Sequence, residues 1–208
     1  MKVLMLNGSP HEKGCTYTAL TEAAKELNKA GIETEILHVG GDDVRGCMGC
    51  GACVKLGRCI YGQDKVNEAV EKMKEAQGLI VGSPVHYASA GGAVTSFLDR
   101  FFYSGGAYAA HKPAAAVASA RRAGTTATLD QLNKYFMISQ MPVVSSQYWN
   151  MVHGGCPEDV KKDEEGLQIM RVLGRNMAWL LQSIEAGKAS GIAVPEMEKE
   201  KKRPNFIR

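Results

Sequence analysis

The stretch that decides the fold is KVLMLNGSPHEKGCTYTAL, residues 2–20. Its first six residues, Lys2–Asn7, form a short apolar run, and the Gly-Ser-Pro that follows cannot continue a strand. From residue 16 to residue 30 the apolar positions recur at helical spacing, and Gly31 stands where a helix commonly ends. A buried strand, a polar loop and an amphipathic helix therefore open the chain.

The same alternation continues along the chain. We expect further strands at 34–39, 78–82, 113–119 and 142–145, and further helices at 64–75, 93–103, 126–139 and 163–186. Five strands that alternate with helices imply an α/β fold, a doubly wound parallel sheet with helices on both faces. We expect one domain over residues 1–190, with a cysteine-rich insertion at 46–60 and a basic tail at 191–208.

Composition excludes several classes of protein. The formal charge of the 208 residues is +3, and much of it comes from the tail, so nucleic-acid binding has little support. The sequence contains no apolar stretch long enough to span a bilayer, and the N-terminal run is too short for a signal peptide. We therefore expect a cytoplasmic protein without a membrane role, whose six cysteines are not a disulfide framework.

The loop after the first strand has the composition of an anion site. In open α/β sheets, ligands bind beyond the carboxyl ends of the strands. Here Ser9, Thr16 and Thr18 offer hydroxyl donors, and the loop leads into a helix N-terminus that favours negative charge. The loop matches neither the dinucleotide nor the nucleoside-triphosphate glycine pattern, so a single terminal phosphate fits better. A helix cap followed by a polar turn is the alternative.

Loops after three later strands are expected at the same edge. Residues 83–92 combine an aromatic side chain with small residues, which suits a flat and partly polar ring. Arg121 and Arg122 follow the fourth strand, and Tyr148 and Trp149 follow the fifth. Any one of these loops is compatible with a surface turn, but their convergence on one edge favours a ligand site.

These residues carry a family resemblance. Asn7-Gly8-Ser9-Pro10 through Thr16, with Gly82–Tyr87 and Phe97-Leu98-Asp99-Arg100, resembles the flavodoxin-like NAD(P)H-dependent FMN reductases, especially the branch that includes the iron–sulfur flavoproteins. The resemblance extends from residue 1 to about residue 186. It implies the strand order 2-1-3-4-5 and one FMN per site.

The resemblance also implies which residues bind the cofactor. The phosphate would lie on Ser9, His11, Cys15, Thr16 and Thr18. The isoalloxazine would lie along Pro84, Val85, His86 and Tyr87, and the loop from Arg121 to Gly124 would close its other side. Two positions depart from the family pattern, because His11 replaces a more usual Arg or Lys and Cys15 stands where Asn or Ser is common.

Four cysteines cluster between residues 47 and 59. Cys47, Cys50, Cys53 and Cys59 are separated by two, two and five residues, which matches the compact spacing of thiolates around a 4Fe–4S cluster. A zinc site usually joins two C-x-x-C pairs across a longer loop, so zinc fits less well. A packed loop of small buried side chains, a redox-active dithiol and a disulfide remain alternatives.

The function predicted from the sequence is an NAD(P)H-dependent FMN oxidoreductase, similar to flavin or quinone reductases, that reduces a small acceptor. Hydride transfer through a flavin needs no acid–base residue of its own, so we nominate no catalytic residue. The first alternative is an iron–sulfur flavoprotein that carries electrons between protein partners. The second is a structural or zinc-binding protein with a vestigial flavin site. A homodimer or homotetramer is expected, since the resemblance implies that a second subunit helps cover the flavin.

Overall fold

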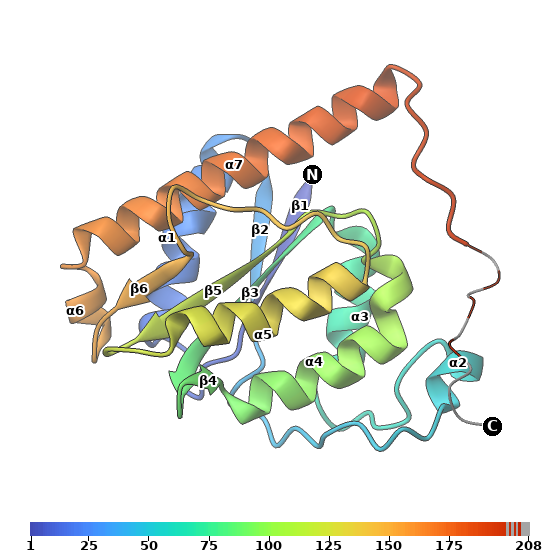
Figure 1. Ribbon diagram of the computed structural model, residues 1–208, viewed down its shortest axis with the longest axis horizontal. Coiled ribbons are helices and arrows are strands. Elements are labelled where there is room, and N and C mark those ends of the chain that lie inside the picture. Colours follow the sequence, from blue (N-terminus) through green and yellow to red (C-terminus); the bar gives the residue numbers. More distant parts are fainter. Residues whose placement is uncertain (199, 201, 203, 205–208) are drawn as a thin grey trace.

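A parallel sheet lies between two layers of helices in the computed structural model, which describes residues 1–198, 200, 202 and 204 (Figure 1). The strands are β1 (Lys2–Asn7), β2 (Glu33–His38), β3 (Gly78–His86), β4 (Ser89–Ala90), β5 (Ala114–Ala120) and β6 (Met151–His153). The helices are α1 (Cys15–Lys29), α2 (Ala52–Leu56), α3 (Val66–Glu75), α4 (Gly92–Gly105), α5 (Thr125–Ile138), α6 (Pro157–Val160) and α7 (Glu164–Ala189), with a 3₁₀ turn, η1 (Gly106–Tyr108).

The sheet order is β2-β1-β3-β5-β6, and all of these neighbours are parallel. The short β4 pairs antiparallel with β3 and lies off this path. The predicted order 2-1-3-4-5 is therefore confirmed for the parallel strands, although the sheet has six strands rather than five. Strand order reverses between β1 and β3, which is where an open α/β sheet binds its ligand.

The fifth parallel strand lies later in the chain than the sequence predicted. At the expected position, 142–145, Val143 makes an isolated bridge to Ala114, and the strand itself is β6, paired with the end of β5. Strand β3 is longer than predicted, because it continues through Pro84 to His86. β1 ends opposite Gly82, so Pro84 has β5 as its neighbour but no longer β1, and a proline is tolerated at such an edge.

The two faces of the sheet bury separate cores, and β1 contributes to both. Leu4 and Leu6 pack with side chains from α3, α4 and α5, while Val3 and Met5 pack with α1 and α7. This alternation follows from the two-residue period of a strand. Gly174 of α7 lies against α1 so closely that a β-carbon there would come within 2.5 Å of the Ala23 carbonyl oxygen. Tight packing of α7 thus fixes the position of α1, whose N-terminus faces the candidate site.

The chain after α7 is only partly described. Of the basic tail expected over 191–208, residues 199, 201, 203 and 205–208 lie outside the described residues. Met197 reaches the surface between α4 and α5. In the described part of the chain, no helix combines the length and the apolar character needed to cross a membrane.

Candidate functional site

The loop that follows β1 is shaped by a buried asparagine. The Asn7 side chain donates from Nδ2 to the carbonyl of Glu12 at 2.8 Å and accepts from the Ser9 amide at 3.2 Å. Ser9 in turn accepts from the His11 amide at 3.1 Å. The loop is also tied to the sheet, since the Gly8 amide donates to the Gly82 carbonyl at 2.8 Å. These bonds hold the loop open in front of α1.

The N-terminus of helix α1 faces this loop. Gly14 is its N-cap, and within the described chain no side chain caps the helix and its first turn holds no acidic residue. Thr18 makes the first intrahelical bond, to the Gly14 carbonyl, so the amides of the first turn have no partner within the helix. Free amides and the positive end of the helix dipole together favour an anion.

The predicted hydroxyl donors differ in their availability. Ser9 is buried and keeps its own proton to donate, because its oxygen accepts from His11. Thr16 is buried too, but its hydroxyl is paired with Ser119 at 2.8 Å, and the Thr18 hydroxyl donates back to the Gly14 carbonyl at 3.1 Å. Main-chain amides and Ser9 are thus the donors that the structure leaves free at this loop.

Two other predicted phosphate-loop residues lie nearer the surface. His11 is exposed beside the loop. Cys15 is half-buried at the start of α1, with its sulfur 3.7 Å from the Gly154 carbonyl oxygen. Burial raises the pKa of the Cys15 thiol, and the neighbouring Cys156 raises it further.

A tight hairpin forms at the end of β3. Strands β3 and β4 are joined by Tyr87 and Ala88, with φ of 49° and 60°, a left-handed pair that non-glycine residues rarely adopt. Gln131 of α5 holds this hairpin, since its side-chain oxygen accepts from the Ser89 hydroxyl at 2.6 Å and from the Ala90 amide at 3.1 Å. The Tyr87 side chain is fully exposed at the tip.

The loop after β5 packs directly on this hairpin. Gly124 has φ of +94°, and a β-carbon there would lie 2.6 Å from the Ala88 Cα and 2.8 Å from a Val85 methyl. Arg121 and Arg122 are exposed on the same loop. The structure therefore brings together the Pro84–Tyr87 segment and Gly124, while Gly8 and Gly82 join the first loop to β3.

The aromatic pair Tyr148 and Trp149 does not follow the fifth strand as predicted. Both residues precede β6, because that strand lies later than expected. They contact each other edge to face, with ring centroids 4.7 Å apart, and each is about half exposed. They line a hollow with Leu129 and Asn133 of α5 rather than extending beyond the strand ends.

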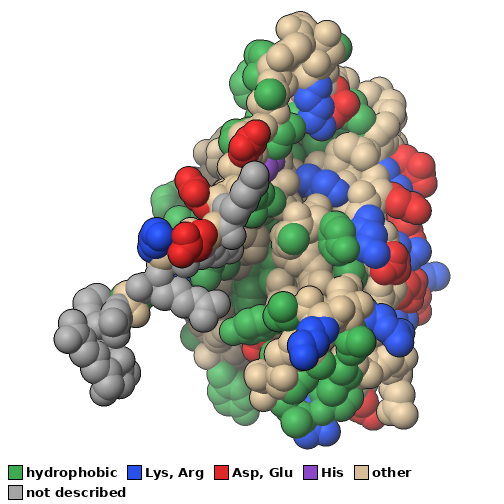
Figure 2. Space-filling view, turned by 90° about the vertical axis from the view of Figure 1, so that its right-hand side faces the viewer, with side chains coloured by type: hydrophobic (Ala, Val, Ile, Leu, Met, Phe, Trp, Pro, Cys, Tyr) green, Lys and Arg blue, Asp and Glu red, His purple; other side chains and the backbone are tan. Residues whose placement is uncertain are grey.

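The four clustered cysteines line one cavity of about 210 Å³. Cys47 and Cys50 are exposed, and Cys53 and Cys59 are half-buried. Among the residues that the structure describes, however, no three His, Cys, Asp or Glu side chains are arranged to hold a metal ion. The predicted ligands thus share a cavity without converging. Hydrophobic side chains gather at the lower end of the face in Figure 2, the end where Figure 1 places α2.

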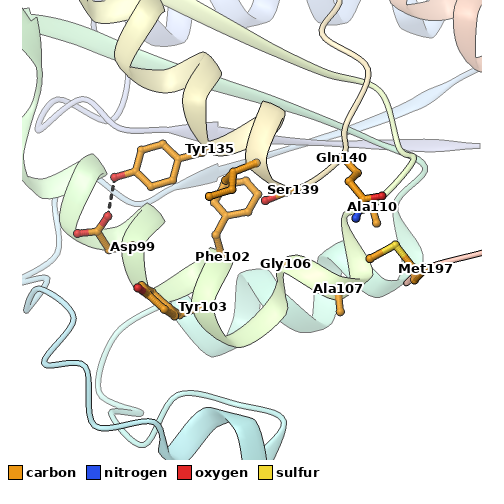
Figure 3. A pocket seen from close by; sticks show the side chains of 11 residues that line it. Asp99, Phe102, Tyr103, Gly106, Ala107, Ala110, Tyr135, Ser139, Gln140 and Met197 are labelled. Atoms are coloured by element: carbon orange, nitrogen blue, oxygen red, sulfur yellow. Dashed lines mark hydrogen bonds between the residues drawn. The ribbon is translucent and has the colours of Figure 1, made fainter. Parts of the chain in front are cut away.

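A larger cavity, about 460 Å³, lies between α4 and α5 away from these loops (Figure 3). Phe102 and Tyr135 stack in its wall, and the Tyr135 hydroxyl donates to Asp99 at 2.6 Å. Burial, with Asp99 adding to it, raises the pKa of Tyr135 well above its usual range. Asp99 is thus engaged by Tyr135, and the other described side chains of the wall are largely apolar.

Three residues that organise these loops were not among the site residues predicted from the sequence. Asn7, Ser119 and Gln131 act through partners 5, 103 and 42 residues away, respectively. Asn7 carries a weak local signal, since a polar residue ends an otherwise apolar strand just before a glycine turn. Ser119 and Gln131 have no such signal, because their partners meet them only in the folded chain.

The chain is similar to known flavoproteins along most of its length. An iron–sulfur flavoprotein of Methanocaldococcus jannaschii is 32% identical over 89% of this chain and 100% of its own length. An NADH:FMN oxidoreductase structure superposes with a TM-score of 0.60 at 22% identity, covering 88% of this chain and 89% of that one. A flavodoxin from the domain Archaea superposes with a TM-score of 0.60 at 16% identity, over 88% and 99% of the two chains, so the fold is flavodoxin-like.

The match to a known family covers the strand-end loops described above. Residues 1–155 match the family described as NADPH-dependent FMN reductase, a range that includes β1 to β6 and all four clustered cysteines. The chain therefore belongs to the NADPH-dependent FMN reductase family, a family of flavodoxin-like flavoproteins.

Proposed function

We propose that this chain binds FMN at the carboxyl edge of its sheet and acts as an NAD(P)H-dependent oxidoreductase toward a small acceptor. The observation that carries the proposal is the contact of two strand-end loops, after β3 and β5, beside the uncapped N-terminus of α1. Family membership supports the cofactor.

The phosphate end of FMN fits the first loop. Amides of the first turn of α1 and the Ser9 hydroxyl are free to donate, and the exposed His11 is proposed to add a charge-assisted bond. Thr16 would contribute only by exchanging its bond to Ser119 for one to the phosphate. One helix end suits a single phosphate, which favours FMN over FAD.

The ring end fits the hairpin and the loop that packs on it. Main-chain amides of Val85–Tyr87 are proposed to face the ring, and Gly124 keeps the two loops in contact. When bound, the flavin supplies the hydride and electron chemistry, and the protein binds and orients it. The exposed Arg121 and Arg122 are proposed to hold an anionic part of NAD(P)H or of the acceptor.

Anaerobic purification followed by a visible spectrum tests the proposal. We expect flavin bands, FMN rather than FAD in the mass spectrum of the released cofactor, and bleaching of those bands by NADH or NADPH. Reoxidation by a quinone then identifies a reductase. A protein that is not bleached by either nicotinamide but exchanges electrons with a reduced ferredoxin would favour the carrier alternative.

The second candidate is an iron–sulfur flavoprotein, favoured by the shared cavity of Cys47, Cys50, Cys53 and Cys59. The relative at 32% identity carries that name. Four thiols in one cavity are a suitable donor set for a 4Fe–4S cluster, and Gly49, Gly51 and Gly57, all with positive φ, allow the chain to turn sharply between them. We propose that the sulfurs converge when a cluster binds. Iron and sulfide assays after anaerobic reconstitution test this, with zero content rejecting it.

We also propose that the protein is a homodimer or homotetramer. The candidate flavin edge is open, and the exposed aromatic pair Tyr148 and Trp149 and the apolar side chains of the cysteine segment offer surface for a second subunit. Among those apolar side chains, Val54 is 88% exposed.

A further inference from the structure

A buried arginine on α4 lies at the base of the cysteine segment. Arg100 is 2% exposed, and its guanidinium forms an ion pair with Asp64, including a bond of 3.2 Å to Oδ1. A buried ion pair adds little net stability, because both groups lose their hydration. The planar guanidinium of Arg100, however, holds its N–H donors in a fixed, fork-like geometry, and it therefore fixes the positions of the groups that accept from it.

The remaining donors of Arg100 reach both ends of the cysteine segment. Nε donates to the Cys59 sulfur at 3.2 Å, one terminal nitrogen donates to the Arg45 carbonyl at 3.2 Å, and the other donates to the Tyr61 carbonyl at 3.1 Å. A single side chain therefore holds the chain just before Cys47 and just after Cys59. The aromatic ring of Tyr61 adds to this hold, since the guanidinium groups of Arg45 and Arg100 lie 5.0 and 5.3 Å from its centroid.

Cys59 is consequently fixed more firmly than the other three cysteines. Asn67 of α3 accepts from the Cys59 amide at 2.9 Å and donates to the Cys59 carbonyl at 3.0 Å. Cys47 and Cys50, by contrast, are exposed on an arc that turns through Gly49 and Gly51. The four thiols thus divide into Cys59, which hydrogen bonds hold in place, and three thiols on a segment that turns at two glycines before it enters the short helix α2.

We propose that Arg100 is the positioning residue of the cysteine segment: it presets Cys59 as the fixed ligand around which the arc of Cys47, Cys50 and Cys53 closes. This inference rests on the cluster proposed above. It explains why the four thiols share a cavity without forming a ligand set. It also gives the cluster an N–H···S bond from a cation, and such bonds raise the reduction potential of an iron–sulfur centre.

Hydrogen exchange of the cluster-free protein tests the anchoring directly. Arg100→Lys keeps the charge but loses the fork, so amides of residues 59–64 should exchange about tenfold faster or more. Arg58→Lys makes the same change at an exposed arginine of the same segment and should leave exchange unchanged. Asp64→Asn, which removes the ion-pair partner without touching Arg100, is the second variant if Arg100→Lys does not fold. FMN content, read from the visible spectrum, should match the wild type in all folded variants.

Reconstitution adds a readout that a purely structural role would not change. Arg100→Lys should take up less iron than Arg58→Lys, and any cluster that forms should have a more negative midpoint potential than in the wild type. Unchanged exchange at residues 59–64, or wild-type iron content and potential in Arg100→Lys, would overturn the proposal. If the wild type itself takes up no iron, the cluster proposal fails, while the exchange experiment still decides whether Arg100 anchors Cys59.

Discussion

Gly124 and Ala88 lie in contact where the loops after β3 and β5 meet, so close that a β-carbon on Gly124 would come within 2.6 Å of the Ala88 Cα. The two residues belong to loops that follow different strands, and both have positive φ. Their contact sets the spacing of the two loops proposed to hold the isoalloxazine.

Gly124→Ala should separate these loops. The left-handed backbone and the overlap with Ala88 together should cost on the order of 3 kcal/mol in the free energy of unfolding. FMN affinity should fall as well. Gly31→Ala is the matched control, because Gly31 has φ of +75° but no atom within 4 Å of the added carbon. Its cost should stay near 1–2 kcal/mol, roughly the backbone strain alone, with FMN affinity unchanged. Equal FMN affinity in the two variants would contradict the proposed site.

Ser9→Ala should weaken FMN binding by about 1.5–3 kcal/mol, since it removes a donor to a charged phosphate. The buried Ser9 hydroxyl also accepts from the His11 amide, so the loop should loosen slightly. Titration of the apoprotein with FMN, followed by flavin fluorescence, measures the effect. Ser190→Ala, at the C-cap of α7, is the control. An unchanged dissociation constant in Ser9→Ala would show that the phosphate binds elsewhere.

Cys15 should react slowly with iodoacetamide in the cluster-free protein. Burial and the neighbouring Cys156 raise the pKa of its thiol, and the thiolate is the reactive form. At about pH 8 the exposed Cys47 and Cys50 should be labelled first, as judged by peptide mass spectrometry. Cys156→Ser should speed the labelling of Cys15, because it removes one contribution to the raised pKa. Labelling of Cys15 ahead of Cys47 would be inconsistent with this environment.

Glu35 should make stability depend on acid pH. Hydrogen bonds from Lys2, at 2.6 Å, and from Lys72 lower the pKa of this carboxyl. Because the pKa of Glu35 is lowered on folding, its contribution to the free energy of unfolding is present above about pH 4.3, the usual pKa of Glu. That contribution is lost as the pH falls through the folded-state pKa. Glu35→Gln should therefore cost about 0.2–1 kcal/mol per ion pair at neutral pH and close to nothing near pH 2. Urea unfolding across that range measures it, and a pH-independent difference would exclude an ionic origin.

Light scattering at micromolar protein concentration should show a dimer or tetramer. If Trp149 lies in the interface, Trp149→Glu should shift the protein toward the monomer, because it places a charge in an apolar contact. Trp179→Glu changes another exposed tryptophan, on α7, and serves as the control. A monomeric wild type would refute the oligomer proposal, and a shift in Trp179→Glu instead would place the interface on α7.

The sequence by itself determined the class of fold and the strand-end loops in which we propose the site. Apolar periodicity and glycine turns located β1, α1 and most later elements, since burial on one face imposes a local repeat on the chain. The same repeat failed at the fifth strand, where residues 142–145 and 151–153 are both short and apolar, and only pairing with β5 selects the second. Short runs carry too few positions to separate a strand from an extended loop.

Tertiary structure alone decided which side chains are free to act. Thr16 looks like a phosphate donor in sequence, yet its hydroxyl meets Ser119, which lies 103 residues later. Arg100 belongs to a family-like stretch in sequence, and only folding places its guanidinium on Asp64, 36 residues earlier, and on the sulfur of Cys59. The physical reason is the same in both cases. A residue's type fixes which bonds it can make, but close packing of distant segments fixes which partner it meets and which of its donors remain unpaired.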